Sequence, residues 1–182
     1  SAGSLRDRMI YQMTPNDFDS VMKSNAKSAF TTTKFAAILF RQQRRGRIVN
    51  MVADSGLGDV GRSNYAAATE AIIGLTRTTA KDLGKYGITA NAISALAETR
   101  LFAGSVEERR LSNVQSPTRD ERAGIGPSPE IQKWGGEGYS DHPDNVAPLA
   151  VYLCTYASPN INGYVLGARG GSLYVYSNPE IE

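Results

Sequence analysis

The sequence predicts an α/β protein built on a parallel sheet, and two observations carry that prediction. Short β-branched runs at Ile48–Val52 and Ile88–Ile93 read as strands. Residues 18–43, before the first run, and Ser63–Leu83, between the two runs, carry apolar residues at helical spacing. Helices alternating with strands are typical of parallel strands joined by crossover helices. We therefore expect a doubly wound sheet.

The composition fits an ordinary globular domain and excludes several function classes. The 182 residues are 41% hydrophobic and 21% charged, so we expect a single domain over residues 1–182. The net charge of +2 is too small to indicate binding to nucleic acid or an anionic membrane, and no apolar run could span a bilayer. Cys154 cannot form an internal disulfide and is expected to be buried on a helix. Nothing points to an oxidising compartment, and a cytoplasmic location is expected.

The first helix is predicted to run from Thr14 to about Gln43. Thr14 can cap the helix, and the proline that follows it suits a first helical turn. Near the other end, Ile38 and Leu39 make the helix apolar nearly all round. Such a helix is buried on more than one side, in a core or against a partner.

The remaining segments are less regular. Residues 54–62 are glycine-rich and should turn, whereas residues 101–140 are charged and rich in proline and glycine. We expect the latter to be a variable loop on the substrate side, with at most a short helix near 105–111. A further helix should begin at Pro143 and reach about Tyr156, followed by a strand at 164–167. Residues 173–176 either extend that strand or form a separate edge.

A glycine pattern in the turn matches the dinucleotide fingerprint GxGxxG as a string. It runs from Gly56 to Gly61, after a strand and before a helix. The fingerprint also needs an acid at the end of the next strand to hold a ribose. Here Ile93 is followed by Ser94 and Ala95, and Asp82, at roughly the right spacing, lies inside a helix. We therefore interpret the pattern as a glycine-rich connection.

A family resemblance rests on six stretches of the chain. They are Gly46–Asn50, Asn64–Ala68, Ile72–Arg77, Leu83–Ile93, Val146–Leu153 and Ile161–Gly163. Together they resemble the short-chain dehydrogenase/reductases, especially bacterial ketoacyl reductases and hydroxyacyl-CoA dehydrogenases. The resemblance implies a Rossmann-like doubly wound parallel sheet. It also implies that the family's N-terminal cofactor-binding strands are absent from this sequence, by truncation or because they were not observed, since Ser1–Gly3 resembles the end of the turn after the fourth strand.

The resemblance also implies where catalytic residues should lie. Members of this family usually carry a serine, a tyrosine and a lysine, with an asparagine that holds a water for proton relay. Tyr65 fits the tyrosine and Asn25 the asparagine. The serine position falls on Val52, which has no hydroxyl, and the lysine position falls on Thr69, which carries no charge.

Further changes accompany these two. The proline and glycine that the family usually shows beside the nicotinamide are replaced by Ala95 and Leu96. Ser55 lies near the serine position but in a different register. A phenol with a pKa of about 10 is a poor acid–base partner without its lysine. We therefore expect Tyr65 and Asn25 to be vestigial, with no competent catalytic residue, bound cofactor or metal on this chain.

Two other side chains invite a functional interpretation, and a structural one is preferred for His142. His142 precedes a proline at a helix start, so a surface cap is expected rather than a ligand. Trp134 lies in the variable loop, where it could cover a pocket or anchor the loop.

The expected function is a degenerate, non-catalytic subunit that supports an active paralogue. The resemblance implies an NAD-dependent hydroxyacyl (acyl-CoA) dehydrogenase complex, with NAD on the partner and hetero-oligomer contacts through helices 15–43 and 63–83. The chain is similar to the non-catalytic subunit of two-subunit hydroxyacyl-CoA dehydrogenases of anaerobic aromatic degradation, such as the benzylsuccinyl-CoA pathway. Two alternatives stay open: an NAD(P)-dependent oxidoreductase with an altered site, and a ligand-binding module without redox activity.

Overall fold

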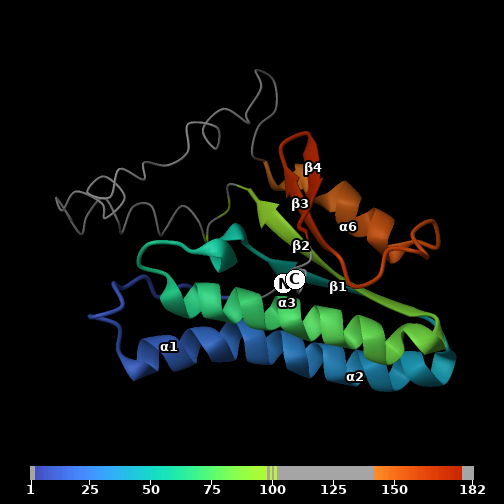
Figure 1. Ribbon diagram of the computed structural model, residues 1–182, viewed down its shortest axis with the longest axis horizontal. Helices are drawn as coiled ribbons and strands as arrows, with labels where there is room; N and C mark the ends of the chain where they lie inside the picture. The colour runs from blue at the N-terminus through green and yellow to red at the C-terminus, as the bar shows by residue number, and fades with distance from the viewer. Residues whose placement is uncertain (1–2, 98, 100, 102–141, 178–182) are drawn as a thin grey trace, which may run out of the picture.

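The strands form one four-stranded sheet in the order β1-β2-β3-β4 (Figure 1). The computed structural model describes residues 3–97, 99, 101 and 142–177. The strands are β1 (Gly46–Val52), β2 (Ile88–Leu96), β3 (Val165–Arg169) and β4 (Ser172–Val175). β1, β2 and β3 are parallel, and β4 runs antiparallel to β3. The predicted parallel α/β sheet is confirmed, and residues 173–175 of the last predicted segment lie in a separate edge strand, β4.

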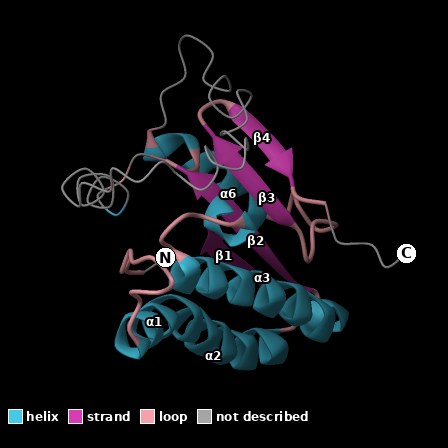
Figure 2. Cartoon of the chain, turned by 60° about the vertical axis from the view of Figure 1, so that its left-hand side comes forward, coloured by secondary structure: helices cyan, strands magenta, loops and turns pink. Residues whose placement is uncertain are grey.

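Helices cover both faces of this sheet (Figure 2). The α-helices are α1 (Pro15–Met22), α2 (Ser28–Gln43), α3 (Ser63–Leu83) and α6 (Ala147–Cys154). α1, α2 and α3 lie on one face and α6 lies on the other. Short 3₁₀ turns are η2 (Asp54–Leu57), η3 (Gly84–Tyr86) and η5 (Pro143–Asn145). Because helices cover both faces of the sheet, the central strand β2 is buried from Ile88 to Ser94.

The first helix begins as predicted but is not continuous. Thr14 Oγ1 accepts from the backbone N–H of Asp17, and Asp17 Oδ2 accepts from the backbone N–H of Thr14, each at 3.1 Å. This reciprocal capping box satisfies two donors at the helix start. The predicted single helix is divided by a π-helical segment, η1 (Lys23–Lys27). Because the π segment is only five residues long, the apolar spacing of the sequence gave no sign of it.

The core has a layer on each side of the sheet. The layer under α3 contains Val52, Ile72, Ile73, Ala92 and Val165. The layer under α6 contains Ile93, Val146, Leu149, Leu153 and Ala168. Burying each large aliphatic side chain contributes about 1.5–3 kcal/mol to folding. The layer under α3 holds this helix against the sheet. The first turn of α3 then lies near the ends of β1 and β2, where the candidate site lies.

Two burial predictions have different outcomes. Cys154 is exposed, so the prediction that it is buried is wrong. α6 turns Leu149 and Leu153, one helical turn apart, toward the sheet, and the residue after Leu153 therefore faces outward. At the far end of α2, Ile38 is 45% exposed and Leu39 57%. The described part of the chain does not cover these two side chains, and their burial against a partner stays a prediction.

Several predictions lie outside the described residues. They concern Trp134, the short helix near 105–111 and nearly all of the loop at 101–140. Within the described ranges, β1 is hydrogen-bonded to a strand on one side only. No helix in these ranges is long and apolar enough to cross a membrane.

Gly167 on β3 makes a close approach that can be tested. It is the cross-strand partner of Tyr174, whose ring lies directly over it, so that a Cβ there would overlap the ring. We predict that Gly167→Ala lowers the free energy of unfolding by about 1–3 kcal/mol, as overpacking does. The matched control is Gly74→Ala on α3, where a Cβ meets nothing within 4 Å. That change should stabilise the helix by up to about 1 kcal/mol. Urea denaturation of both variants measures the difference, and equal stabilities would contradict the packing.

Candidate functional site

A cavity of about 560 Å³ lies where β1 and β2 end. Its described walls come from four places: the last residues of both strands, the η2 turn, the first turn of α3, and the start of α2 with the N-terminal segment. The C-terminal ends of parallel strands are where ligands bind in open α/β sheets. The cavity is therefore the candidate site.

Three of the four predicted catalytic positions meet at this cavity. Tyr65, Asn25 and Val52 all line it. Tyr65 comes from the first turn of α3, Asn25 from η1 and Val52 from the end of β1. Thr69 is not among the described lining residues. It is 2% exposed, and its methyl group packs against Gly56 in η2.

Val52, at the predicted serine position, has no hydroxyl group, and Thr69, at the predicted lysine position, has no charge. Val52 belongs to the apolar layer under α3 and offers no hydrogen bond. Thr69, one helical turn after Tyr65, carries no charge and is covered by the η2 turn. Ser55, the nearest hydroxyl in sequence to Val52, donates a 3.0 Å hydrogen bond to Asp59. It is thus engaged within its own turn.

Asn25 anchors the N-terminal segment. Its side-chain amide donates to the backbone carbonyls of Ser4 at 3.0 Å and Val21 at 2.9 Å. Gly3 lies so close that a Cβ there would overlap the Asn25 carboxamide oxygen. The hydrogen bond to Ser4 and the close packing of Gly3 hold the N-terminal segment against the helix beside the cavity. The geometry supports a structural role for Asn25.

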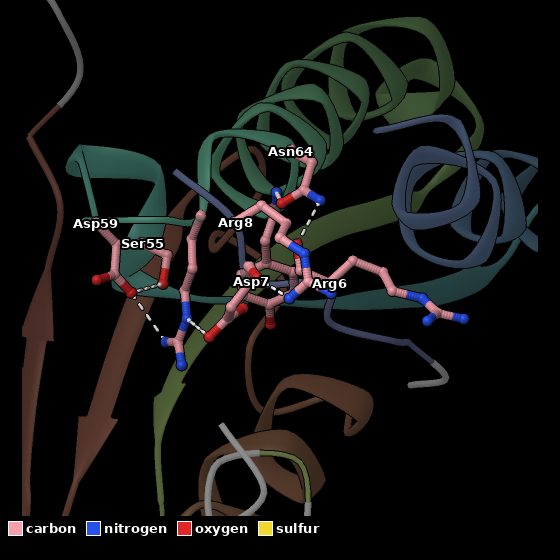
Figure 3. Close-up of polar contacts among 8 residues, drawn as sticks. Arg6, Asp7, Arg8, Ser55, Asp59 and Asn64 are labelled. Carbon is pink, nitrogen blue, oxygen red and sulfur yellow. Dashed lines mark hydrogen bonds and ion pairs between the residues drawn. The ribbon is translucent and has the colours of Figure 1, made fainter. Parts of the chain in front are cut away.

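A buried arginine bridges the two sides of the site (Figure 3). Arg62 Nε contacts Asp7 Oδ2 at 3.0 Å, and Arg62 Nη1 contacts Asp59 Oδ2 at 2.9 Å. The Arg62 side chain is only 5% exposed and that of Asp7 10%. Next to it, Asn64 Nδ2 donates to the backbone carbonyl of Arg6 at 2.9 Å. These contacts tie the N-terminal segment, the glycine-rich turn and the start of α3 into one wall.

The environment of Tyr65 sets its proton chemistry. Burial raises the pKa of its phenol above the ordinary 10.0, and the charge of Arg62 opposes this with a smaller lowering effect. Arg62 also faces two carboxylates, which compensate its charge. A phenol with a raised pKa keeps its proton at neutral pH and is a weak acid–base catalyst.

The sequence reading missed five polar residues of the site. Asp7, Asp59 and Arg62 form the ion bridge, and Asn64 pins the N-terminal segment. Asp54 lines the cavity and accepts hydrogen bonds from groups on β2 and β4. The local signal was the pair of acids and the arginine inside a glycine-rich turn, but their partners lie far away in sequence.

The two remaining predictions concern His142 and metal ligands. His142 caps η5: its Nδ1 accepts from the backbone N–H of Asp144 at 3.3 Å, and its side chain is 62% exposed. The surface-cap prediction is confirmed. Among the described residues, no group of three histidine, cysteine or acidic side chains could hold a metal ion.

Comparison with known proteins agrees with the fold. The family model for short chain dehydrogenase matches residues 1–109. Hydroxyacyl-CoA dehydrogenase ChsB1 of Mycobacterium tuberculosis is 30% identical over 191 residues, covering 100% of this chain and 54% of that protein. FabG, the 3-oxoacyl-[acyl-carrier-protein] reductase of Thermotoga maritima, is 29% identical, covering 94% and 63%.

A solved structure is also similar. A short chain dehydrogenase from Mycobacterium avium superposes with a TM-score of 0.73 at 28% identity, covering all of this chain and 56% of that one. The canine (3R)-3-hydroxyacyl-CoA dehydrogenase is 31% identical, covering 93% of this chain and 60% of its own length. The chain thus spans a little over half of the length of such relatives.

The ion bridge predicts a large effect on stability. Arg62→Met should lower the free energy of unfolding by about 3–5 kcal/mol, because it removes a charged partner from the buried Asp7 carboxylate. Arg45→Met, at an exposed arginine on the opposite end of β1, should change it by less than about 0.5 kcal/mol. Chemical denaturation at neutral pH measures both. A loss of under about 1 kcal/mol for Arg62→Met would contradict the bridge.

The phenol of Tyr65 should ionise above its ordinary pKa. Because burial favours the neutral form, we predict that the wild-type minus Tyr65→Phe absorbance difference at 295 nm has its midpoint above pH 10.0. By linkage, the contribution of Tyr65 to folding stability is fully present below its pKa in the unfolded state. It falls as the pH rises through the higher pKa that Tyr65 has in the folded state. An ionisation midpoint about two pH units below 10.0, as a neighbouring cation would produce, would contradict the environment described.

Proposed function

Because the chain belongs to the short-chain dehydrogenase family but has valine and threonine where the resemblance places serine and lysine, we propose that it is a non-catalytic subunit. It supports an active paralogue in an NAD-dependent hydroxyacyl dehydrogenase complex, with an acyl-CoA as the substrate class. The single observation that carries the proposal is the buried, uncharged Thr69 one turn after Tyr65. No described cation other than the ion-paired Arg62 is among the groups that perturb the pKa of Tyr65.

The nicotinamide cofactor that the family implies does not fit the described residues at this point. A lysine there would hold the nicotinamide ribose and depress the tyrosine pKa. Thr69 can do neither, because it is uncharged and packed under η2 rather than on the cavity wall. Val52 likewise cannot donate to a substrate carbonyl. The proposal therefore places the cofactor and the hydride transfer on the partner.

Helix surfaces support assembly with that partner. Phe30 and Phe35 on α2 are 50% and 61% exposed. On α3, Ala71, Gly74 and Thr78 form an exposed row of small residues at helical spacing, which allows another helix to approach closely. Exposed large apolar side chains on one helix and small exposed residues on another favour a helix–helix contact with a partner. The proposal assigns residues 15–43 and 63–83 to it.

The substrate class follows from relatives and is part of the proposal. Three of the similar proteins carry the names hydroxyacyl-CoA dehydrogenase or 3-oxoacyl reductase. A cavity large enough for part of an acyl chain supports the same class. The cavity also favours one alternative, a ligand-binding module without redox activity. An altered NAD(P)-dependent enzyme would need Tyr65 itself to work.

The deciding experiment compares two tyrosines in one complex. The protein is purified from its source, its partners are identified by native mass spectrometry, and NAD-linked oxidation of a 3-hydroxyacyl-CoA is assayed. Tyr65→Phe should change kcat by less than about twofold, since the phenol takes no part in proton transfer. The equivalent change in the co-purifying paralogue should lower kcat by at least about 10²-fold, the usual size of a lost general acid–base contribution.

Two outcomes would overturn the proposal. One is a homo-oligomer that turns over the substrate and loses activity with Tyr65→Phe, which would make this chain the enzyme. The other is a single species without any dehydrogenase partner that binds an acyl-CoA, which would favour the ligand-binding alternative.

A further inference from the structure

A cluster of one carboxylate and three hydroxyl groups lies behind the cavity, apart from the four predicted catalytic positions. Asp54 Oδ1 accepts hydrogen bonds from Ser94 and Tyr176, and Tyr174 donates to Asp54 Oδ2 at 3.4 Å. Tyr176 also lies 3.2 Å from the Ser94 hydroxyl. Asp54 comes from η2, Ser94 from β2 and Tyr174 from β4, and Tyr176 directly follows β4. Three separate elements therefore meet at one carboxylate.

The packing around the cluster is built to hold both tyrosines. The Tyr174 ring covers Gly167, where any side chain would overlap it. The two tyrosine rings lie 5.6 Å apart at a tilt of 52°, a favourable arrangement for aromatic pairs. Tyr176 also packs against the apolar layer that contains Val52. The packing of both rings thus holds the hydroxyl groups of Tyr174 and Tyr176 within hydrogen-bond reach of Asp54.

Asp54 stands between this cluster and the cavity. It lines the cavity, whereas Tyr174 and Tyr176 do not, and Ser94 is 1% exposed. It also begins η2, the turn that carries Ser55 and leads through Asp59 to the Arg62 bridge. Ser94 is the ladder partner of Val52. The carboxylate therefore connects the floor of the cavity to the wall that continues to Tyr65.

We propose that Asp54 is a positioning residue that ties the η2 wall of the cavity to β4, so that the C-terminal strand sets the shape of the cavity. The inference goes beyond the proposed function and does not depend on it, because it concerns the cavity of this chain whether or not a partner performs the chemistry. A ligand that fills the cavity would meet a wall held from the far edge of the sheet. Release of β4 would loosen that wall.

The test is amide hydrogen exchange in the full chain, read separately over residues 54–61 and over α3. Asp54→Asn, Tyr174→Phe and Tyr176→Phe should each speed exchange over 54–61, by about tenfold for Asp54→Asn, since a hydrogen bond to a charged group is lost. Exchange over α3 should stay within about twofold of the wild type. The phenylalanine variants keep the rings and their packing, which isolates the hydroxyl.

Matched controls come from the same chain. Asp82→Asn removes an exposed carboxylate from α3, and Tyr164→Phe removes a hydroxyl from a tyrosine that is 42% exposed. Neither should alter exchange over 54–61. Unchanged exchange in all three cluster variants would overturn the proposal. So would an equal increase over 54–61, α3 and the sheet, because that would show a general loss of stability.

A spectroscopic readout separates positioning from bulk destabilisation. Burial and the hydrogen bond to Asp54 raise the pKa of Tyr176, and burial followed by the charge of Asp54 raises that of Tyr174, which Arg169 partly offsets. In Asp54→Asn, both phenols should ionise closer to the ordinary 10.0 in an absorbance titration at 295 nm. Titration curves that superpose on the wild type would show that the carboxylate does not hold these hydroxyls, and the proposal would fail.

Discussion

The packing of α3 across β1 and β2 is the constraint from which the rest of the site follows. Ile72 and Ile73 on the helix bury against Val52, Ala92 and Val165 on three strands. The parallel crossover from β1 through α3 to β2 fixes the direction of the helix, so that its first turn lies at the C-terminal ends of the strands. Tyr65 is at the cavity for that reason alone. Its position there would be the same in an active enzyme and in an inactive subunit.

What distinguishes the two is the environment of the phenol. An acid–base tyrosine needs a cation that favours its ionised form. Here burial has the larger effect and raises the pKa, and the nearby Arg62 faces Asp7 and Asp59. Arg62 lowers the pKa of Tyr65 less than burial raises it, and the same arginine joins the N-terminal segment to the glycine-rich turn. The polar groups of the site thus stabilise its walls.

The sequence predicts local features well and long-range ones poorly. The parallel sheet, α3 and the Thr14 cap follow from patterns within a few residues, and the structure confirms them. The Asp54 cluster joins residues 40, 120 and 122 positions apart, so no local pattern marks it. The ion bridge from Asp7 to Arg62 spans 55 positions.

Two other differences have local causes that the sequence pattern did not resolve. Cys154 is exposed because α6 is short and turns only one face to the sheet. The π segment around Asn25 is five residues long, too short for the apolar spacing to reveal it. Tyr65, Asn25 and Val52 were found together through the family resemblance, and the structure places them on one cavity. Thr69 stands apart from them under η2.

We propose that this chain keeps the family fold and does not itself carry out hydride transfer. The most direct measurement is the number of NADH molecules bound per assembled complex, from fluorescence titration of the intact protein at known subunit stoichiometry. We predict one bound NADH for each partner subunit and none bound by this chain. Saturation at one NADH for every subunit, this one included, would contradict it.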